Sequence, residues 1–150
     1  MRGKDLVAIG AIGWCCVFAA LHVFWAAGGS AGLASSAGNE LAAHRPTAFV
    51  VLGLWGVAAV LMAAAVVVGV AMNAQLPPRL RRILGWLITA AGLAMLARAV
   101  MIEILLITDA GGVRTEVGPQ QTHWSLVLWN PWFAIGGVLF TWTGRRVTQR

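Results

Sequence analysis

The sequence predicts an all-α membrane protein in which four transmembrane helices form one bundle. Two features of its composition predict this fold class. Of the 150 residues, 59% are hydrophobic and only 11% are charged, which is more apolar surface than a soluble domain of this length can bury. The charged residues also lie mostly at the ends of four long apolar runs and in their connections, as a bilayer requires.

The four apolar runs cover about residues 6–27, 48–72, 83–107 and 123–143. Each has roughly the twenty residues that an α-helix needs to cross a hydrocarbon core of about 30 Å. The first run follows Met1-Arg2-Gly3-Lys4, a start that also suits a signal peptide, but its core is longer than the roughly 7–15 residues usual there. We therefore expect a retained helix and a single domain over residues 1–150.

The basic residues predict the orientation of the bundle. Short cytoplasmic segments collect Lys and Arg, and eight of the basic residues would lie on one side: Arg2, Lys4, Arg79, Arg81, Arg82, Arg145, Arg146 and Arg150. Only Arg45 and Arg114 would lie on the other side, and Arg98 is inside a span. We expect a multi-pass protein of the cell membrane with both termini cytoplasmic. Because the net charge of +6 is then a topology signal, no nucleic-acid partner is expected.

The first span carries a histidine near its outer end. His22 lies about five residues before that end, roughly 7–8 Å below the boundary at 1.5 Å per residue. Trp25 follows at i+3 on the same helix face. This pair is typical of a site that contacts a ligand, but it also suits a helix-to-helix hydrogen bond with Trp25 as an interfacial anchor.

The third span contains a charge that needs a partner. An unpaired Arg98 inside the bilayer costs about 2.5–3.5 kcal/mol on insertion scales. Glu103 is five residues further on, about 140° around the helix, so the two side chains are poor neighbours. One or both must therefore face another helix, either in a structural contact or in a ligand site.

The fourth span contains the sequence Trp129-Asn130-Pro131-Trp132. Pro131 removes the backbone hydrogen bond to the carbonyl of Val127, which predicts a kink. The freed carbonyl and the Asn130 amide then need partners at nearly the depth of His22 and Arg98. Small residues elsewhere in the spans are expected to let helix backbones approach closely: Gly53, Gly56, Gly85, Gly92, Gly136 and Gly137.

These features together predict a polar, tryptophan-lined cavity that opens outward. The candidate catalytic residues are His22, Arg98 and Glu103. The candidate ligand-binding residues are Trp25, Trp129, Asn130, Trp132, Asp109, Glu40 and His44. No metal and no cofactor are expected, because the two cysteines, Cys15 and Cys16, are adjacent and too few for a metal or redox site.

The chain resembles a family of small bacterial four-span membrane proteins catalogued as a domain of unknown function. The resemblance covers most of the chain and rests on His22-x-x-Trp25-x-x-Gly28-Gly29, on Arg98 and on Trp129-x-Pro131. The family pattern has an acidic residue shortly before the aromatic-x-Pro motif, where this sequence has Ser125. The resemblance implies the four-span fold and the polar cluster, and it implies no reaction.

Three functions fit these observations. The first is binding of an amphipathic or isoprenoid-like molecule from the membrane, with or without isomerase- or cyclase-like acid–base chemistry by His22 or Glu103 and charge stabilisation by Arg98. The second is a proton-coupled exporter that uses Glu103. The third is a non-catalytic subunit whose Arg98 pairs with a partner. Membrane lipid is an expected partner, and a homo-oligomer is left open.

Overall fold

The computed structural model describes residues 3–73 and 75–149, and the side chains of residues 6–72 and 75–149. The predicted orientation also used Arg2, Lys4 and Arg150. The structure does not describe Arg2, Arg150 or the side chain of Lys4. Within the described part, four helices are long and apolar enough to cross a membrane. The expected all-α, four-span fold class is confirmed.

The four long helices begin and end close to the predicted spans. The first is α1 (Gly3–Ala26), and the second consists of the π-helix η1 (Phe49–Gly56) followed by α4 (Val57–Asn73). The third is α5 (Pro78–Thr108). The fourth is a continuous run of α7 (Pro119–Trp124), the π-helix η3 (Ser125–Trp129) and α8 (Asn130–Thr148). The third and fourth helices therefore extend several residues beyond their apolar runs.

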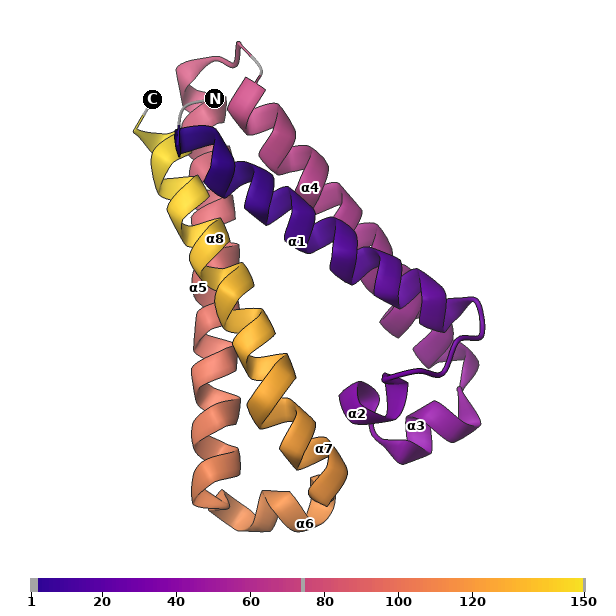
Figure 1. Ribbon diagram of the computed structural model, residues 1–150. Helices are drawn as coiled ribbons and strands as arrows, with labels where there is room; N and C mark the ends of the chain where they lie inside the picture. Colours follow the sequence, from indigo (N-terminus) through magenta and orange to yellow (C-terminus); the bar gives the residue numbers. More distant parts are fainter. Residues whose placement is uncertain (1–2, 74, 150) are drawn as a thin grey trace.

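The long helices form two antiparallel hairpins (Figure 1). In one hairpin α1 packs against α4, and in the other α5 packs against α8. The hairpins approach each other at the end that holds the start of α1, the end of α8 and the turn between α4 and α5, which we call the terminal end. They separate toward the opposite end, which we call the loop end.

Two pairs of facing glycines hold α5 against α8. A Cβ atom on Gly92 would lie 2.8 Å from the Gly137 carbonyl oxygen, and one on Gly137 would lie 2.9 Å from the Gly92 carbonyl oxygen. Gly85 and Gly144 face each other in the same way, with distances of 3.0 and 2.6 Å. The expected packing role of Gly85, Gly92 and Gly137 is therefore confirmed, since no larger side chain fits between these backbones.

The two connections at the loop end contain short helices. The first holds α2 (Leu33–Ala37) and α3 (Asn39–His44), and the second holds the 3₁₀ turn η2 (Ala110–Gly112) and α6 (Val113–Val117). An arginine ties each connection to the helix before it. Arg45 donates hydrogen bonds to the carbonyls of Trp25 and Gly29, and Arg114 to those of Leu106 and Ile107. The Trp25, Leu106 and Ile107 carbonyls belong to the last turns of α1 and α5, where an α-helix leaves carbonyls without an intrahelical partner.

The helix before Pro131 changes its hydrogen-bond pattern. Residues Ser125–Trp129 form a π-helix, and the Asn130 N–H donates to the Ser125 carbonyl, five residues earlier. Pro131 has no N–H to donate, and a π-helical segment is one way in which a helix accommodates a local break in its i→i+4 bonds. A π-helical segment therefore precedes Pro131, and the kink expected there stays a prediction.

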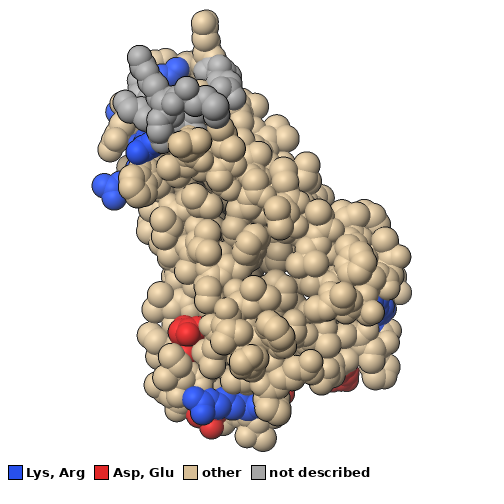
Figure 2. Space-filling model, in the orientation of Figure 1, with Lys and Arg blue, Asp and Glu red and all other residues tan. Residues whose placement is uncertain are grey.

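The surface of the molecule has the charge distribution of a membrane protein. Figure 2 shows basic side chains near the terminal end and both signs of charge in the part toward the loop end, with an uncharged surface between them. Large apolar side chains point outward along the helices, among them Leu52 (73% exposed), Val60 (68%) and Trp86 (63%). Lipid is the medium in which such a surface is stable.

Candidate functional site

Aromatic side chains join α1 to α8 along the interior of the bundle. The rings of Trp14 and Trp132 stack with their centroids 5.6 Å apart, and Trp14 Nε1 donates a hydrogen bond to the Trp132 carbonyl at 3.0 Å. Phe18 packs against Trp129 and Phe133, with centroid distances of 6.4 and 5.6 Å. Trp132, a predicted ligand-binding residue, therefore lies in the packed contact between two helices.

His22 lies at the loop-end edge of this aromatic cluster and is 7% exposed. Its Nδ1 lies 2.8 Å from the Phe18 carbonyl oxygen in the same helix, so Nδ1 carries the proton and donates. The Phe18 and Trp25 rings meet the imidazole edge-on at 4.5 and 5.2 Å. The helix-to-helix hydrogen bond considered for His22 is therefore replaced by a bond within α1, and its Nε2 has no hydrogen-bond partner among the described residues.

Trp25 and Trp129 are held by the first connection. Trp25 Nε1 donates to the Ala31 carbonyl at 2.8 Å, and Trp129 Nε1 donates to the Ser35 carbonyl at 3.0 Å. The two rings pack edge-to-face with centroids 6.0 Å apart. Trp25 is only 1% exposed, so the alternative in which it anchors the helix at the interface is wrong. The connection folds back over the end of α1 and covers this ring.

A cavity of about 590 Å³ lies beside these two tryptophans at the loop end. Residues of α1, of the first connection and of the segment α7–η3 line it, and Trp124 adds a third indole. The lining residues are Leu21, Trp25, Ser30, Ala31, Gly32, Ala34, Ser35, Gln120, Trp124, Leu128 and Trp129. Two of them, Trp25 and Trp129, were predicted from the sequence.

Arg98 and Glu103 both turn toward the last helix but contact different residues. The Arg98 guanidinium carbon lies 3.9 Å from the centroid of the Phe133 ring, a cation–π contact. Asn130 Nδ2 donates to Glu103 Oε2 at 2.7 Å. No ion pair joins the two residues. Each charged group thus finds a neutral partner on the neighbouring helix, as the angle between them around α5 required.

Glu103 and Asn130 line a separate, smaller groove of about 280 Å³ between α5 and α8. Asn130 is 3% exposed, and its Oδ1 is buried without a hydrogen-bond partner in the described part of the chain. Val100 and Ile104, which are more than half exposed, form one wall of the groove. This groove therefore faces the lipid side of the α5–α8 hairpin, apart from the tryptophan cavity.

The predicted site residues of the connections lie at the loop-end surface. His44 Nδ1 lies 3.1 Å from the Glu40 carbonyl oxygen within α3, and Asp109 Oδ1 accepts a hydrogen bond from the Arg114 backbone N–H at 3.0 Å. These contacts stabilise short helices and a helix end. None of Glu40, His44 and Asp109 lines the tryptophan cavity.

The sequence reading missed several cavity residues. Leu21 and Leu128 look like ordinary lipid-facing residues, and Ala31 and Ala34 lie in a connection with no chemical signal. Trp124, next to the polar start of the fourth span, carried the only available signal, because tryptophans at such boundaries often contact amphipathic groups.

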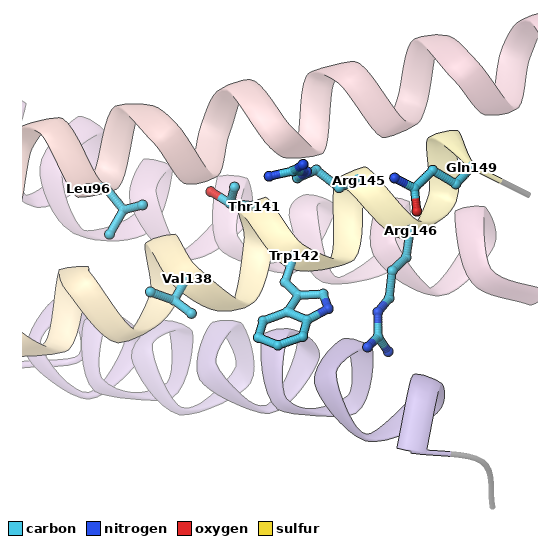
Figure 3. Close-up of a pocket in the computed structure, with 7 residues that line it drawn as sticks. All are labelled: Leu96, Val138, Thr141, Trp142, Arg145, Arg146 and Gln149. Atoms are coloured by element: carbon cyan, nitrogen blue, oxygen red, sulfur yellow. The ribbon is translucent and has the colours of Figure 1, made fainter.

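A further cavity of about 420 Å³ lies between α5 and α8 near the terminal end (Figure 3). It is lined by Leu96, Val138, Thr141, Trp142, Arg145, Arg146 and Gln149. Figure 3 shows the Arg145 side chain on the α5 side of α8, with Trp142 and Arg146 on the α1 side.

The fold and these sites define a multi-pass membrane protein with a tryptophan-lined cavity at one end and basic side chains at the other. The chain belongs to the family described as "Protein of unknown function (DUF3995)", which matches residues 15–140. The resemblance to a four-span family of unknown function is thereby confirmed. No curated protein and no solved structure matches the chain.

Proposed function

We propose that this protein binds an amphipathic or isoprenoid-like small molecule in the tryptophan cavity at the loop end. One observation carries the proposal: three indoles, Trp25 of α1 and Trp124 and Trp129 of the segment α7–η3, line one cavity of about 590 Å³. Ligand sites in proteins typically occupy about 300–1,000 Å³ and combine aromatic walls with a few polar groups. Ser30, Ser35 and Gln120 would supply the polar groups here.

Binding fits this geometry better than catalysis. An acid–base reaction needs its titratable groups around one reacting centre. His22 lies against Trp25, Arg98 lies over Phe133, and Glu103 bonds to Asn130. Of the three, only His22 neighbours a residue of the cavity wall, so it is the candidate that could act on a bound molecule. Proton-coupled export through Glu103 and a subunit role for Arg98 stay predictions.

The basic residues support an outward position for this cavity. Arg79, Arg81, Arg82, Arg145 and Arg146 all belong to the terminal end, and short cytoplasmic segments collect such residues. The cavity lies at the other end, so a ligand would enter from the outer leaflet or from outside the cell.

The test fills the cavity without removing a tryptophan. Ala34→Phe places a ring inside the cavity, whereas Ala43→Phe makes the same change at an exposed residue of the same connection that does not line it. Because overpacking costs about 1–3 kcal/mol, we expect Ala34→Phe to lower ligand occupancy about tenfold. Ala43→Phe should keep the wild-type occupancy.

Occupancy is measured by native mass spectrometry of protein purified in lipid nanodiscs, followed by extraction and identification of the bound molecule. Wild-type protein should carry an apolar or amphipathic molecule beyond the disc lipids. Equal occupancy in wild-type protein and Ala34→Phe would contradict the proposal, as would a wild-type protein that carries no such molecule.

A further inference from the structure

We infer that the terminal end of the α5–α8 hairpin carries a binding site for one two-chain anionic phospholipid, with the phosphate held by Arg145. This site is separate from the tryptophan cavity and does not depend on the proposed function. The inference rests on the charge of the site, on the shape of the space around Arg145, and on the apolar surface that continues from it.

The described charged side chains at this end are cationic. Arg145 and Arg146 both line the cavity of Figure 3, and no ion pair holds either of them among the described side chains. Arg146 packs over the Trp142 ring at 5.2 Å, and its buried Nη1 has no hydrogen-bond partner among the described residues. The described acidic side chains, from Glu40 to Glu116, all lie toward the loop end. A ligand with several anionic oxygens would supply the negative charge that the described side chains do not place near Arg145.

A single arginine side chain recognises phosphate well. The planar guanidinium presents five N–H donors, and these match phosphate oxygens in a bidentate geometry. Gln149, which also lines the cavity, adds an amide that could donate to an ester or hydroxyl oxygen of a head group. Trp142 is 51% exposed, and exposed indoles are enriched at the head-group level of membranes.

The space around Arg145 has two lobes. The cavity of Figure 3 extends from Gln149 to Val138, eleven residues along the chain or about 16 Å at 1.5 Å per residue. A second cavity, also of about 420 Å³, shares Thr141, Arg145 and Gln149 with it and continues past Trp86 and Leu93. Arg145 therefore stands where the two lobes meet.

Both lobes become apolar away from the arginines. Leu96 and Val138 line the first lobe, and Trp86 and Leu93 line the second. Leu93, Val138 and Trp86 are about half exposed or more, so each lobe opens onto the surface that faces the hydrocarbon. A phosphate at Arg145 with one acyl chain in each lobe matches this layout, whereas free inorganic phosphate would leave both apolar lobes unfilled.

The test titrates purified protein with defined lipids and counts bound molecules by native mass spectrometry. Phosphatidylglycerol is compared with phosphatidylcholine, with single-chain lysophosphatidylglycerol and with inorganic phosphate. Diacyl phosphatidylglycerol should bind at least about tenfold more tightly than phosphatidylcholine, since hydrogen bonds to charged groups contribute more than neutral ones. The single-chain lipid should bind more weakly, and inorganic phosphate should not compete.

Two double variants separate this site from general surface charge. Arg145→Gln with Arg146→Gln should weaken phosphatidylglycerol binding about tenfold or more. Arg79→Gln with Arg82→Gln removes the same charge from the same end but leaves both lobes intact, so binding should stay within about twofold of wild type. If the variant with Arg145→Gln and Arg146→Gln fails to fold, Arg145→Lys with Arg146→Lys takes its place. This variant keeps the charge and should bind more weakly than wild type, because lysine lacks the bidentate geometry.

Equal affinity for phosphatidylglycerol and phosphatidylcholine in wild-type protein would overturn the inference. Equal losses of phosphatidylglycerol affinity in the two double glutamine variants would overturn it too, since they would show a diffuse attraction to surface charge. Ala34→Phe should leave lipid binding at this site unchanged, so failure here and failure of the tryptophan-cavity proposal are distinguishable.

Discussion

Hydrogen bonds from three side chains hold the first connection in place at the loop end of this molecule. The indole N–H groups of Trp25 and Trp129 both donate to carbonyls of the first connection, and Arg45 donates to the Trp25 carbonyl at the end of α1. The two indole bonds satisfy N–H groups of buried tryptophans that would otherwise lack a partner, which is costly at membrane depth. Side chain-to-backbone hydrogen bonds therefore hold two of the tryptophans that line the cavity.

The hydrogen bond of Trp129 can be tested with a conservative change. Trp129→Phe keeps an aromatic ring but leaves the Ser35 carbonyl without its donor, so we expect a loss of about 1 kcal/mol in unfolding free energy. Trp86→Phe is the matched control, because Trp86 is 63% exposed and its Nε1 makes no described hydrogen bond. Thermal unfolding in detergent micelles, followed by far-UV circular dichroism, compares them. An equal effect of both changes would show that the bond contributes nothing.

The contacts of His22 could be predicted from the sequence only in part. Its closeness to Trp25 followed from helix geometry and agrees with the structure. Its hydrogen-bond partner did not follow, because an imidazole can reach either a neighbouring helix or the carbonyl four residues back. The aromatic rings packed around His22 leave the second option.

The α5–α8 hairpin is built on close backbone contact. Gly85 faces Gly144, and Gly92 faces Gly137, so the two helices approach more closely than side chains would allow. Between helices in lipid, this contact supplies the van der Waals packing that replaces a hydrophobic driving force. The lipid site proposed above lies along the same hairpin, beside Leu96 and Thr141, and depends on that packing.

An added methyl group should separate these two helices. Gly92→Ala would place a Cβ atom 2.8 Å from the Gly137 carbonyl oxygen, and overpacking of this kind costs about 1–3 kcal/mol. Gly13→Ala is the control, since nothing lies within 4 Å of a Cβ at Gly13 and alanine is the better helix former by about 1 kcal/mol. Thermal unfolding should show a lower midpoint for the first variant and an equal or higher one for the second. A midpoint for Gly92→Ala at or above wild type would contradict the close contact.

The whole molecule is polarised between its two ends. Described arginines of the α4–α5 turn and of the end of α8 gather at the terminal end, whereas the described carboxylates and the tryptophan cavity lie toward the loop end. An even number of spans brings the start of α1 and the end of α8 to the same side (Figure 1). The basic residues predict that this side is cytoplasmic.

Cysteine labelling tests that orientation. In a background with Cys15→Ser and Cys16→Ser, the exposed positions Asn39 and Gln75 are each changed to cysteine. With a membrane-impermeant maleimide on intact cells, we expect labelling of Asn39→Cys alone, and labelling of Gln75→Cys only after permeabilisation. The reverse pattern would place the cavity on the cytoplasmic side and invert the expected topology.

The number of spans, their approximate bounds and the need for partners at His22, Arg98 and Glu103 all followed from the order of residues. They follow because crossing a bilayer demands about twenty apolar residues in a row, and because polar groups within it must be satisfied. The pairing of α1 with α4 and of α5 with α8, and the partners that each polar side chain contacts, required the folded structure. Arg45, which the sequence offers as a lone basic residue of a connection, becomes the cap of α1 because the chain between them folds back. Such contacts depend on the rotation of each helix about its axis and on how closely glycines let it approach a neighbour, and no local pattern encodes either quantity.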